Sequence, residues 1–284
     1  MSRRSCRSHH EIESIDNMTL IAHISDLHIS DSTFDEEKFL KAVSEINNLQ
    51  PDMIILTGDL TEHGYYVEFE RATKYLEMFE APLFAVPGNH DARNLGYQTF
   101  EELIGEKSWK LTMDGNFTVM GLDSSSPDED KGHVGTPQHM WLEHQLDECV
   151  INENFSIVAL HHHVVPLPQT GRERNVLSDA GDVLKTLTTH EVDLVLSGHK
   201  HVPNIWKLNE TVIVNAGSLA SLKLRGKNKN SYNVYNISDS EIEIYSDEEI
   251  TLLTDYFENR NLKIAFLLGL HCGLRISEIF GLTW

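Results

Sequence analysis

Residues 83–91 read Leu-Phe-Ala-Val-Pro-Gly-Asn-His-Asp, a short apolar run that ends in a cluster of polar side chains. Residues 20–28, Leu-Ile-Ala-His-Ile-Ser-Asp-Leu-His, repeat this plan, and so do residues 53–59, Met-Ile-Ile-Leu-Thr-Gly-Asp. Short apolar runs bounded by turn residues are typical of buried β-strands. The repeated plan therefore predicts a sheet whose strands end in side chains able to carry chemistry.

Seven apolar runs of this kind are spread along the chain, and helical patterns lie between them. The runs are residues 20–24, 53–56, 83–86, 117–120, 157–160, 194–196 and 211–214. Residues 36–48 and 67–79 each place apolar side chains on one helical face, and Thr136-Pro137 has the capping hydroxyl and proline of a helix start. Residues 233–245 alternate like a pair of strands. We expect an α/β fold, a four-layer αββα sandwich with a short helical C-terminal appendage.

The length and composition suit one full-sized globular domain. The chain has 284 residues, of which 40% are hydrophobic and 24% charged, and no apolar stretch approaches the length of a membrane span. Residues 1–17 carry charge without an apolar signal region, so we expect a flexible leader rather than a signal peptide. We expect the main domain over 18–246 and the helical appendage over 247–284.

The charge balance limits the classes of partner. With 44 acidic and 23 basic residues, the formal net charge is −21, which argues against nucleic-acid binding and against an anionic membrane surface. An anionic substrate would then need a local source of positive charge, which bound divalent metals supply. The three cysteines, Cys6, Cys149 and Cys272, form no CxxC pair, which indicates a reduced, cytoplasmic chain.

Five polar clusters, each directly after an apolar run, form the candidate site. They are Asp26-Leu27-His28, Gly58-Asp59, Gly88-Asn89-His90-Asp91, His161-His162-His163 and Gly198-His199-Lys200-His201. Loops at the carboxyl ends of strands in an α/β sheet face one crevice, so we expect the clusters to converge. Carboxylates, imidazoles and an amide suit Mn, Fe or Zn, and the lack of Cys disfavours a closed structural zinc site.

The local geometry of the clusters supports a metal site. In an extended Asp26-x-His28 segment, alternate side chains point to the same side. The glycines before Asp59, Asn89 and His199 permit a sharp turn and close approach. Each cluster alone also fits a plain turn, a surface loop or a packed histidine, but five in order at strand ends favour function.

The ordered set DxH…GD…GNHD…H…GHxH resembles the calcineurin-like metallophosphoesterase superfamily over about residues 18–246. Gly121 to Ser124, Gly135-Thr-Pro-Gln and the HHH…P segment are most similar to its class III cyclic-nucleotide phosphodiesterase branch. The resemblance implies one metal held by Asp26, His28 and His201, a second held by Asn89, His161 and His199, and Asp59 bridging both. The family's H-H-P-P segment points to His161, but Val follows the third histidine here, so His162 stays open as the ligand.

The resemblance also implies a reaction. Two metal ions, Mn or Fe before Zn, would activate a bridging hydroxide that attacks phosphorus in line with the leaving oxygen. His90 would assist the leaving group, and Asp91 would orient His90. The implied substrate is a small phosphodiester, with a 3′,5′-cyclic nucleotide as the leading case. A phosphomonoesterase or protein phosphatase of the same superfamily is one alternative, and a non-catalytic fusion remnant with integrase-type DNA-binding ancestry is another. The oligomeric state is open, with a homodimer among the candidates.

Residues 248–284 have a different character. Leu267 to Glu278 resembles the T-G-L-R-x-S-E-type segment of a tyrosine recombinase (phage integrase), with Arg275 at the position of the phosphate-binding arginine. The likeness covers under forty residues and includes no nucleophilic tyrosine segment, so we expect a truncated fragment without recombinase activity. An accidental likeness in a helical appendage is the alternative.

Three further features are weaker candidates. We expect His63 and His133 to be ordinary loop histidines. The alternatives are that His63 lines the substrate pocket and that His133 reaches the substrate. The basic run Lys223, Arg225, Lys227 and Lys229 reads as a solvated edge, with steering of an anionic substrate as the alternative.

Overall fold

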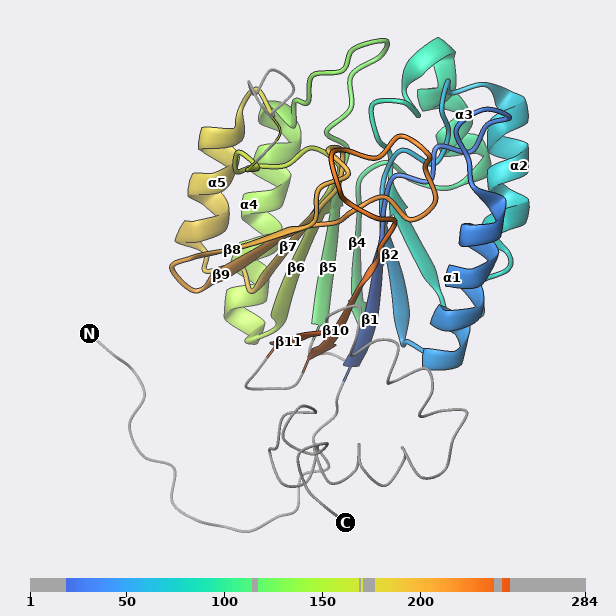
Figure 1. The fold of residues 1–284 in the computed structure, drawn as a ribbon. Helices are drawn as coiled ribbons and strands as arrows, with labels where there is room; N and C mark the ends of the chain where they lie inside the picture. Colours follow the sequence, from blue (N-terminus) through green and yellow to red (C-terminus); the bar gives the residue numbers. More distant parts are fainter. Residues whose placement is uncertain (1–18, 114–116, 169, 171–176, 238–241, 246–284) are drawn as a thin grey trace, which may run out of the picture.

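The computed structural model describes residues 19–113, 117–168, 170, 177–237 and 242–245. Two β-sheets lie face to face between two groups of helices (Figure 1). The first sheet has the order β11-β10-β1-β2-β3, with β1 Thr19–Ile24, β2 Met53–Thr57, β3 Leu83–Val86, β10 Asn233–Ile237 and β11 Ile242–Tyr245. The second has the order β4-β5-β6-β7-β9-β8, with β4 Trp109–Met113, β5 Phe117–Leu122, β6 Phe155–Leu160, β7 Leu194–Ser197, β8 Asn204–Leu208 and β9 Thr211–Asn215.

The helices cover the outer faces of the two sheets (Figure 1). Helices α1 Glu36–Leu49, α2 Tyr66–Leu76 and α3 Gly96–Leu103 lie on the first sheet, with the short 3-10 turn η1 Arg93–Leu95 before α3. Helices α4 Gly135–Asn152 and α5 Ala180–Thr189 lie on the second sheet. The expected four-layer αββα sandwich is confirmed.

Alternating side chains in the central strands fill three layers of core. In β6, Ile157 and Ala159 face the first sheet, whereas Val158 and Leu160 face the helices. Strands buried on both faces read as continuous apolar runs, which is why the sequence located them so clearly. All seven apolar runs lie within strands of the structure, and the strand pair expected over 233–245 is β10 and β11.

The parallel strands place the candidate site at one edge of the sandwich. Strands β1, β2 and β3 run parallel in the first sheet, and β5, β6, β7 and β9 run parallel in the second. Their carboxyl ends meet at the top of the molecule in Figure 1. The loops after β1, β2, β3, β6 and β7 carry the five polar clusters, as expected for this class of sheet.

The start of α4 differs from the prediction. The helix begins at Gly135, with Val134 as N-cap, rather than at Thr136-Pro137. The Asp179 carboxylate accepts hydrogen bonds from the backbone N–H groups of Val134 and Gly135, so a distant side chain supplies the cap.

Some predictions concern residues outside those that the structure describes. The leader 1–17 and the integrase-like segment 247–284 both lie there. Within the described ranges, none of the helices has the length and apolar character to span a membrane.

Candidate metal centre

The backbone of the site loops is in an uncommon conformation. Five of the seven predicted metal ligands have a left-handed φ, namely Asp26 at 55°, His28 at 51°, Asp59 at 55°, His199 at 74° and His201 at 53°. Non-glycine residues seldom adopt this region, and it is enriched at functional sites. The extended geometry expected for Asp26 and His28 is wrong, because their side chains are placed by left-handed turns rather than by strand alternation.

Two glycines allow these loops to approach one another. A Cβ on Gly88 would lie 2.1 Å from Asp59 Oδ1, and one on Gly198 would lie 1.9 Å from Ser25 Oγ. Both contacts are far inside van der Waals distance, so only glycine fits. The predicted need for close approach before Asn89 and His199 is therefore confirmed.

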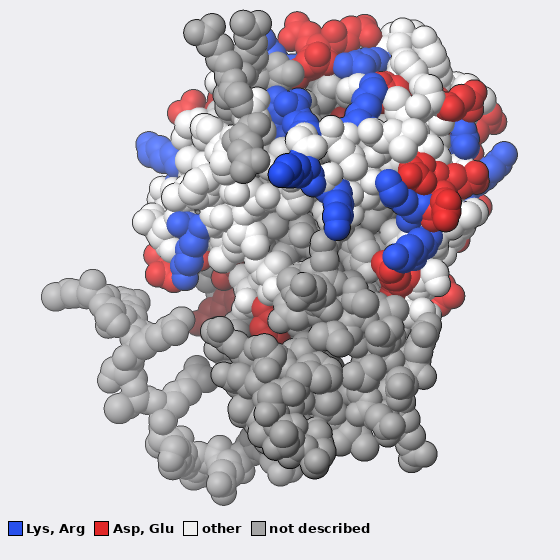
Figure 2. All heavy atoms as spheres, in the orientation of Figure 1, with Lys and Arg blue, Asp and Glu red and all other residues white. Residues whose placement is uncertain are grey.

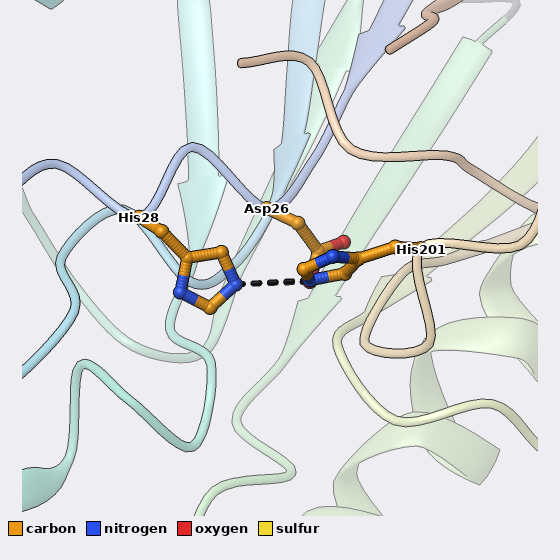
Figure 3. A group of neighbouring side chains, drawn as sticks. All are labelled: Asp26, His28 and His201. Carbon is orange, nitrogen blue, oxygen red and sulfur yellow. Dashed lines mark hydrogen bonds and ion pairs between the residues drawn. The ribbon is translucent and has the colours of Figure 1, made fainter. Parts of the chain in front are cut away.

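Asp26, His28 and His201 form the first group of ligand atoms (Figure 3). His201 Nε2 lies 3.2 Å from Asp26 Oδ1 and 3.0 Å from His28 Nε2. His28 Nε2 lies 3.9 Å from the same Asp26 oxygen. All three residues are buried. The loops after β1 and β7 thus bring together residues 173 positions apart.

Asn89, His161 and His199 form the second group, and Asp59 lies between the two. His161 Nε2 is 3.1 Å from Asn89 Oδ1 and 3.2 Å from His199 Nδ1. Asp59 Oδ2 is 3.4 Å from His161 Nε2 and 3.5 Å from His28 Nε2. One carboxylate oxygen therefore faces a histidine of each group.

The ring orientations show that the centre fits cations. His201 Nδ1 donates to the Lys223 carbonyl at 2.6 Å, and His161 Nδ1 donates to the Thr57 carbonyl at 2.7 Å. Because a carbonyl can only accept, each Nδ1 carries the hydrogen, and in the neutral ring each Nε2 presents a lone pair. Those lone pairs point at carboxylate and amide oxygens. Acceptors that converge in this way match the coordination of divalent metal ions by imidazole and carboxylate.

Further observations agree with a cation site. His199 Nε2 is buried without a hydrogen-bond partner. Burial alone would lower the pKa of His161, but the Asp59 and Asp26 carboxylates outweigh burial and raise this pKa to about 9. Asp26 raises the pKa of His201 against burial in the same way. Without metal, protons on these histidines supply the positive charge that the carboxylates require.

His161 and His162 have different surroundings. His162 Nδ1 lies 2.9 Å from Ser124 Oγ, and its Nε2 lies 3.3 Å from the Asp130 carbonyl oxygen. Burial lowers the pKa of His162 to about 3. Both of its ring nitrogens are thus engaged with the 124–130 segment, whereas His161 turns its Nε2 into the cluster. Of the two alternatives, the geometry favours His161.

His90 and Asp91 are both at the centre but not paired with each other. His90 Nδ1 lies 2.7 Å from the Glu62 carbonyl oxygen and 3.0 Å from Arg93 Nη1, and its ring lies edge-on to His28. The Asp91 carboxylate instead accepts hydrogen bonds from the N–H groups of Gly88, Leu60 and Thr61 and from the Thr61 hydroxyl. Orientation of His90 by Asp91 stays a prediction that no contact of the described residues supports.

One residue at the centre, Glu62, was missed by sequence reasoning. The buried Glu62 carboxylate lies 3.0 Å from His28 Nδ1 and 3.7 Å from His90 Nδ1, and it forms an ion pair with Lys223. Burial raises the pKa of Glu62, but His28 and Lys223 outweigh burial and hold it well below its usual range. The only sequence signal was the acidic position three residues after Asp59, which is also common in plain loops.

The weaker histidine candidates lie outside the cluster. His63 donates its backbone N–H to Glu68, and its Nδ1 lies 2.8 Å from the same carboxylate, so it belongs to the start of α2. His133 is more than half exposed and lies 3.7 Å from Asp179. The expectation that both are ordinary loop histidines agrees with these contacts.

Comparison with known proteins adds a family and a fold. Residues 19–203 match the sequence model of the calcineurin-like phosphoesterase family. A probable cyclic nucleotide phosphodiesterase of Synechococcus is 31% identical over 203 residues, which cover 66% of this chain and 75% of that protein. One of Vesicomyosocius okutanii is 25% identical over 230 residues, which cover 79% and 95%. A probable glycerophosphodiester phosphodiesterase of Arcobacter nitrofigilis is 29% identical over 222 residues, which cover 70% and 78%.

A solved structure shares the architecture. The dimetal phosphatase from Danio rerio superposes with a TM-score of 0.67 at 12% identity and covers 80% of this chain and 95% of its own. At that identity the likeness concerns the fold alone.

Proposed function

Because the chain belongs to the calcineurin-like phosphoesterase family, we propose that it hydrolyses a small phosphodiester at a centre of two metal ions. The observation that carries this proposal is the position of Asp59. Its Oδ2 faces His28 on one side and His161 on the other, at 3.5 and 3.4 Å. A shared carboxylate between two groups of nitrogen and oxygen donors is the arrangement that a pair of divalent ions requires.

The residues divide between the two metal positions as follows. Asp26, His28 and His201 would hold one ion, Asn89, His161 and His199 would hold the other, and Asp59 would bind both. When bound, two divalent ions clamp phosphate oxygens and lower the pKa of a coordinated water. Mn and Fe suit this mixed donor set, and Zn is the alternative.

His90 is proposed to act on the leaving oxygen. Its Nδ1 is engaged with the Glu62 carbonyl, which leaves Nε2 as the nitrogen that can face the substrate. Arg93 Nη1, which can only donate, also lies 3.0 Å from Nδ1, so the carbonyl and the guanidinium favour opposite tautomers of the ring. Donation to the leaving oxygen requires a hydrogen on Nε2, which the tautomer favoured by Arg93 carries.

The substrate class rests on the relatives together with the motif order. Two relatives are named probable cyclic nucleotide phosphodiesterases and a third a probable glycerophosphodiester phosphodiesterase, and all of these names denote diester hydrolases. We therefore place 3′,5′-cyclic nucleotides first and glycerophosphodiesters second. A small, cytoplasmic substrate also suits the predicted cytoplasmic location.

A comparison of three substrates tests this assignment. We expect the Mn²⁺-loaded protein to hydrolyse 3′,5′-cyclic AMP with a kcat/KM well above that for p-nitrophenyl phosphate. A preference for glycerophosphocholine over cyclic AMP would keep the diesterase and change its substrate. A preference for p-nitrophenyl phosphate over both diesters would contradict the proposal and favour a phosphomonoesterase.

A further inference from the structure

The segment of residues 216–232 packs directly against the metal centre. The Leu219 N–H donates to the Ser25 carbonyl at 2.9 Å, and the Ser218 hydroxyl donates to the Asp26 carbonyl at 2.7 Å. The Leu222 N–H bonds the Thr33 carbonyl at 2.8 Å. Figure 2 shows Lys and Arg side chains gathered on the face of the molecule where this segment lies in Figure 1. The basic run that reads as a solvated edge in sequence is therefore anchored beside the ligands.

Lys223 has a different position from the other cations of this run. Its carbonyl accepts a hydrogen bond from His201 Nδ1 at 2.6 Å, which turns His201 Nε2 toward Asp26. Its ammonium forms an ion pair with the Glu62 carboxylate. The Lys223 side chain is about half exposed, whereas that of Glu62 is only 6% exposed. The ion pair thus joins a surface cation to a buried anion.

Glu62 carries the connection on to the second histidine of the same metal position. Its Oε2 lies 3.0 Å from His28 Nδ1, an ion-pair contact without hydrogen-bond alignment, and accepts a hydrogen bond from the Thr33 hydroxyl at 3.1 Å. A carboxylate beside the far nitrogen of a metal-binding histidine favours the tautomer with its hydrogen on that nitrogen, so that the other nitrogen can bind the metal. His28 Nε2 is then the nitrogen that faces Asp59 and His201.

We propose that Lys223 is a positioning residue for the metal position formed by Asp26, His28 and His201. One residue controls both histidines, His201 through its carbonyl and His28 through its ion pair with Glu62. The other position has separate supports: the Asp130 carboxylate pairs with Arg93 and accepts a hydrogen bond from Asn89, and His161 is held by the Thr57 carbonyl. Loss of the Lys223 ammonium therefore weakens one of two metal positions. This inference rests on the proposed two-metal function.

The variant Lys223→Met tests the ion pair with Glu62. It removes the ammonium but keeps the backbone carbonyl that binds His201. Metal-free protein is dialysed against Mn²⁺ at several concentrations, and bound metal is counted. We expect wild type to bind two Mn²⁺, and Lys223→Met to bind one with unchanged affinity and the second about tenfold more weakly or worse. At limiting Mn²⁺, the electron paramagnetic resonance spectrum should change from that of a coupled pair to that of single ions. Lys227→Met, on the same basic run, is the matched control and should behave as wild type.

A conservative variant and a double-mutant cycle separate positioning from general damage. Lys223→Arg keeps the positive charge and should restore most of the second binding event. Glu62→Gln should weaken the same event, and the double variant with Lys223→Met should lose less than the sum of the two single losses.

Several outcomes would overturn the inference. Wild-type affinity at both positions in Lys223→Met would exclude the role of the ammonium, and full additivity with Glu62→Gln would exclude action through Glu62. An equal loss in Lys223→Arg, with both variants folded by circular dichroism, would also contradict it. Wild-type protein that binds no Mn²⁺ pair would instead contradict the proposed function itself.

Discussion

Asp59 and Asp91 are two buried aspartates in neighbouring loops whose surroundings have opposite character. Asp59 Oδ2 faces ring nitrogens of His28 and His161, which present lone pairs when neutral. The Asp91 carboxylate faces four hydrogen-bond donors from Gly88, Leu60 and Thr61. The Asp59 carboxylate therefore needs a nearby cation, whereas hydrogen-bond donors already satisfy the Asp91 carboxylate. The residue type alone therefore does not distinguish a metal ligand from a carboxylate that stabilises the loops. The hydrogen-bond and ion-pair partners of the carboxylate do.

The pKa values follow the same division. Burial raises the pKa of both carboxyls, but the histidines around Asp59 outweigh burial and lower its pKa well below the usual value. Asp91 has no such cation, and burial with the nearby Asp59 charge raises its pKa to about 6 despite its N–H donors. Substitution of the two residues should therefore have different consequences.

The largest effect is expected for Asp59→Asn. The amide removes the shared negative charge, so we expect loss of the Mn²⁺ pair and a fall in diesterase kcat/KM of at least about 100-fold. The free energy of unfolding of the metal-free protein should also fall, by about 3 kcal/mol, because the buried, protonated His161 loses its counter-ion. Metal counting, kinetics and urea unfolding check the three parts. Retention of both ions would contradict the role of Asp59 as the shared ligand.

Asp91→Asn should differ from Asp59→Asn in its effect on metal binding. An amide offers one acceptor oxygen to the donors that the carboxylate now satisfies, so we expect a loss of about 2–4 kcal/mol in the free energy of unfolding. The folded variant should still bind two Mn²⁺. Urea unfolding and metal counting decide the matter, and loss of metal from a variant of normal stability would make Asp91 part of the metal centre.

The third prediction concerns pH and the metal-free protein. The pKa of His161 is about 9 in the fold against about 6.5 in an unfolded chain, so the folded state holds a proton that the unfolded state has released between these values. Stability from this group is complete below about pH 6.5 and is lost as pH rises to about 9, on the order of 1–3 kcal/mol. Urea unfolding at pH 6, 7.5 and 9 measures it. Saturating Mn²⁺ should remove the decline, since metal replaces the proton, and His161→Gln should flatten it in metal-free protein. An unchanged decline in that variant would place the titration elsewhere.

The smallest effect is expected for His63→Ala, a histidine in the same loop as Asp59 but outside the cluster. Its ring lies 2.8 Å from Glu68 and is nearly half exposed, so its loss should cost about 0.5–1 kcal/mol. Activity and metal content should match wild type. A large fall in kcat would extend the site to this residue.

The fold could be read from the sequence to the extent that its information is local. Strands such as β2 and β6 are apolar on both faces and appear as continuous runs. The start of α4 was misplaced because its cap comes from Asp179, 44 residues beyond Gly135. Strands β4 and β8 and helices α3 and α5 were not predicted. The two strands lie at the edges of their sheet, and none of their residues is fully buried, so neither appears as a continuous apolar run.

The candidate site shows the same limit. Its seven ligand candidates stand in local clusters of metal-binding residue types, so the sequence identified them together. The left-handed backbone at Asp26 and His28 was not foreseen, since the D-x-H spacing fits an extended segment equally well. The partnership of Glu62 with Lys223 joins residues 161 positions apart, and only the folded chain reveals it.

Hydrolysis of bis(p-nitrophenyl) phosphate by chelator-stripped protein, with and without Mn²⁺ and beside Asn89→Ala, tests the central claim most directly. We predict negligible hydrolysis without metal, activity that appears as Mn²⁺ is added, and a loss of at least about 100-fold in the variant. Soluble, folded protein that binds Mn²⁺ and leaves the diester intact would contradict the assignment of this chain as a two-metal phosphodiesterase.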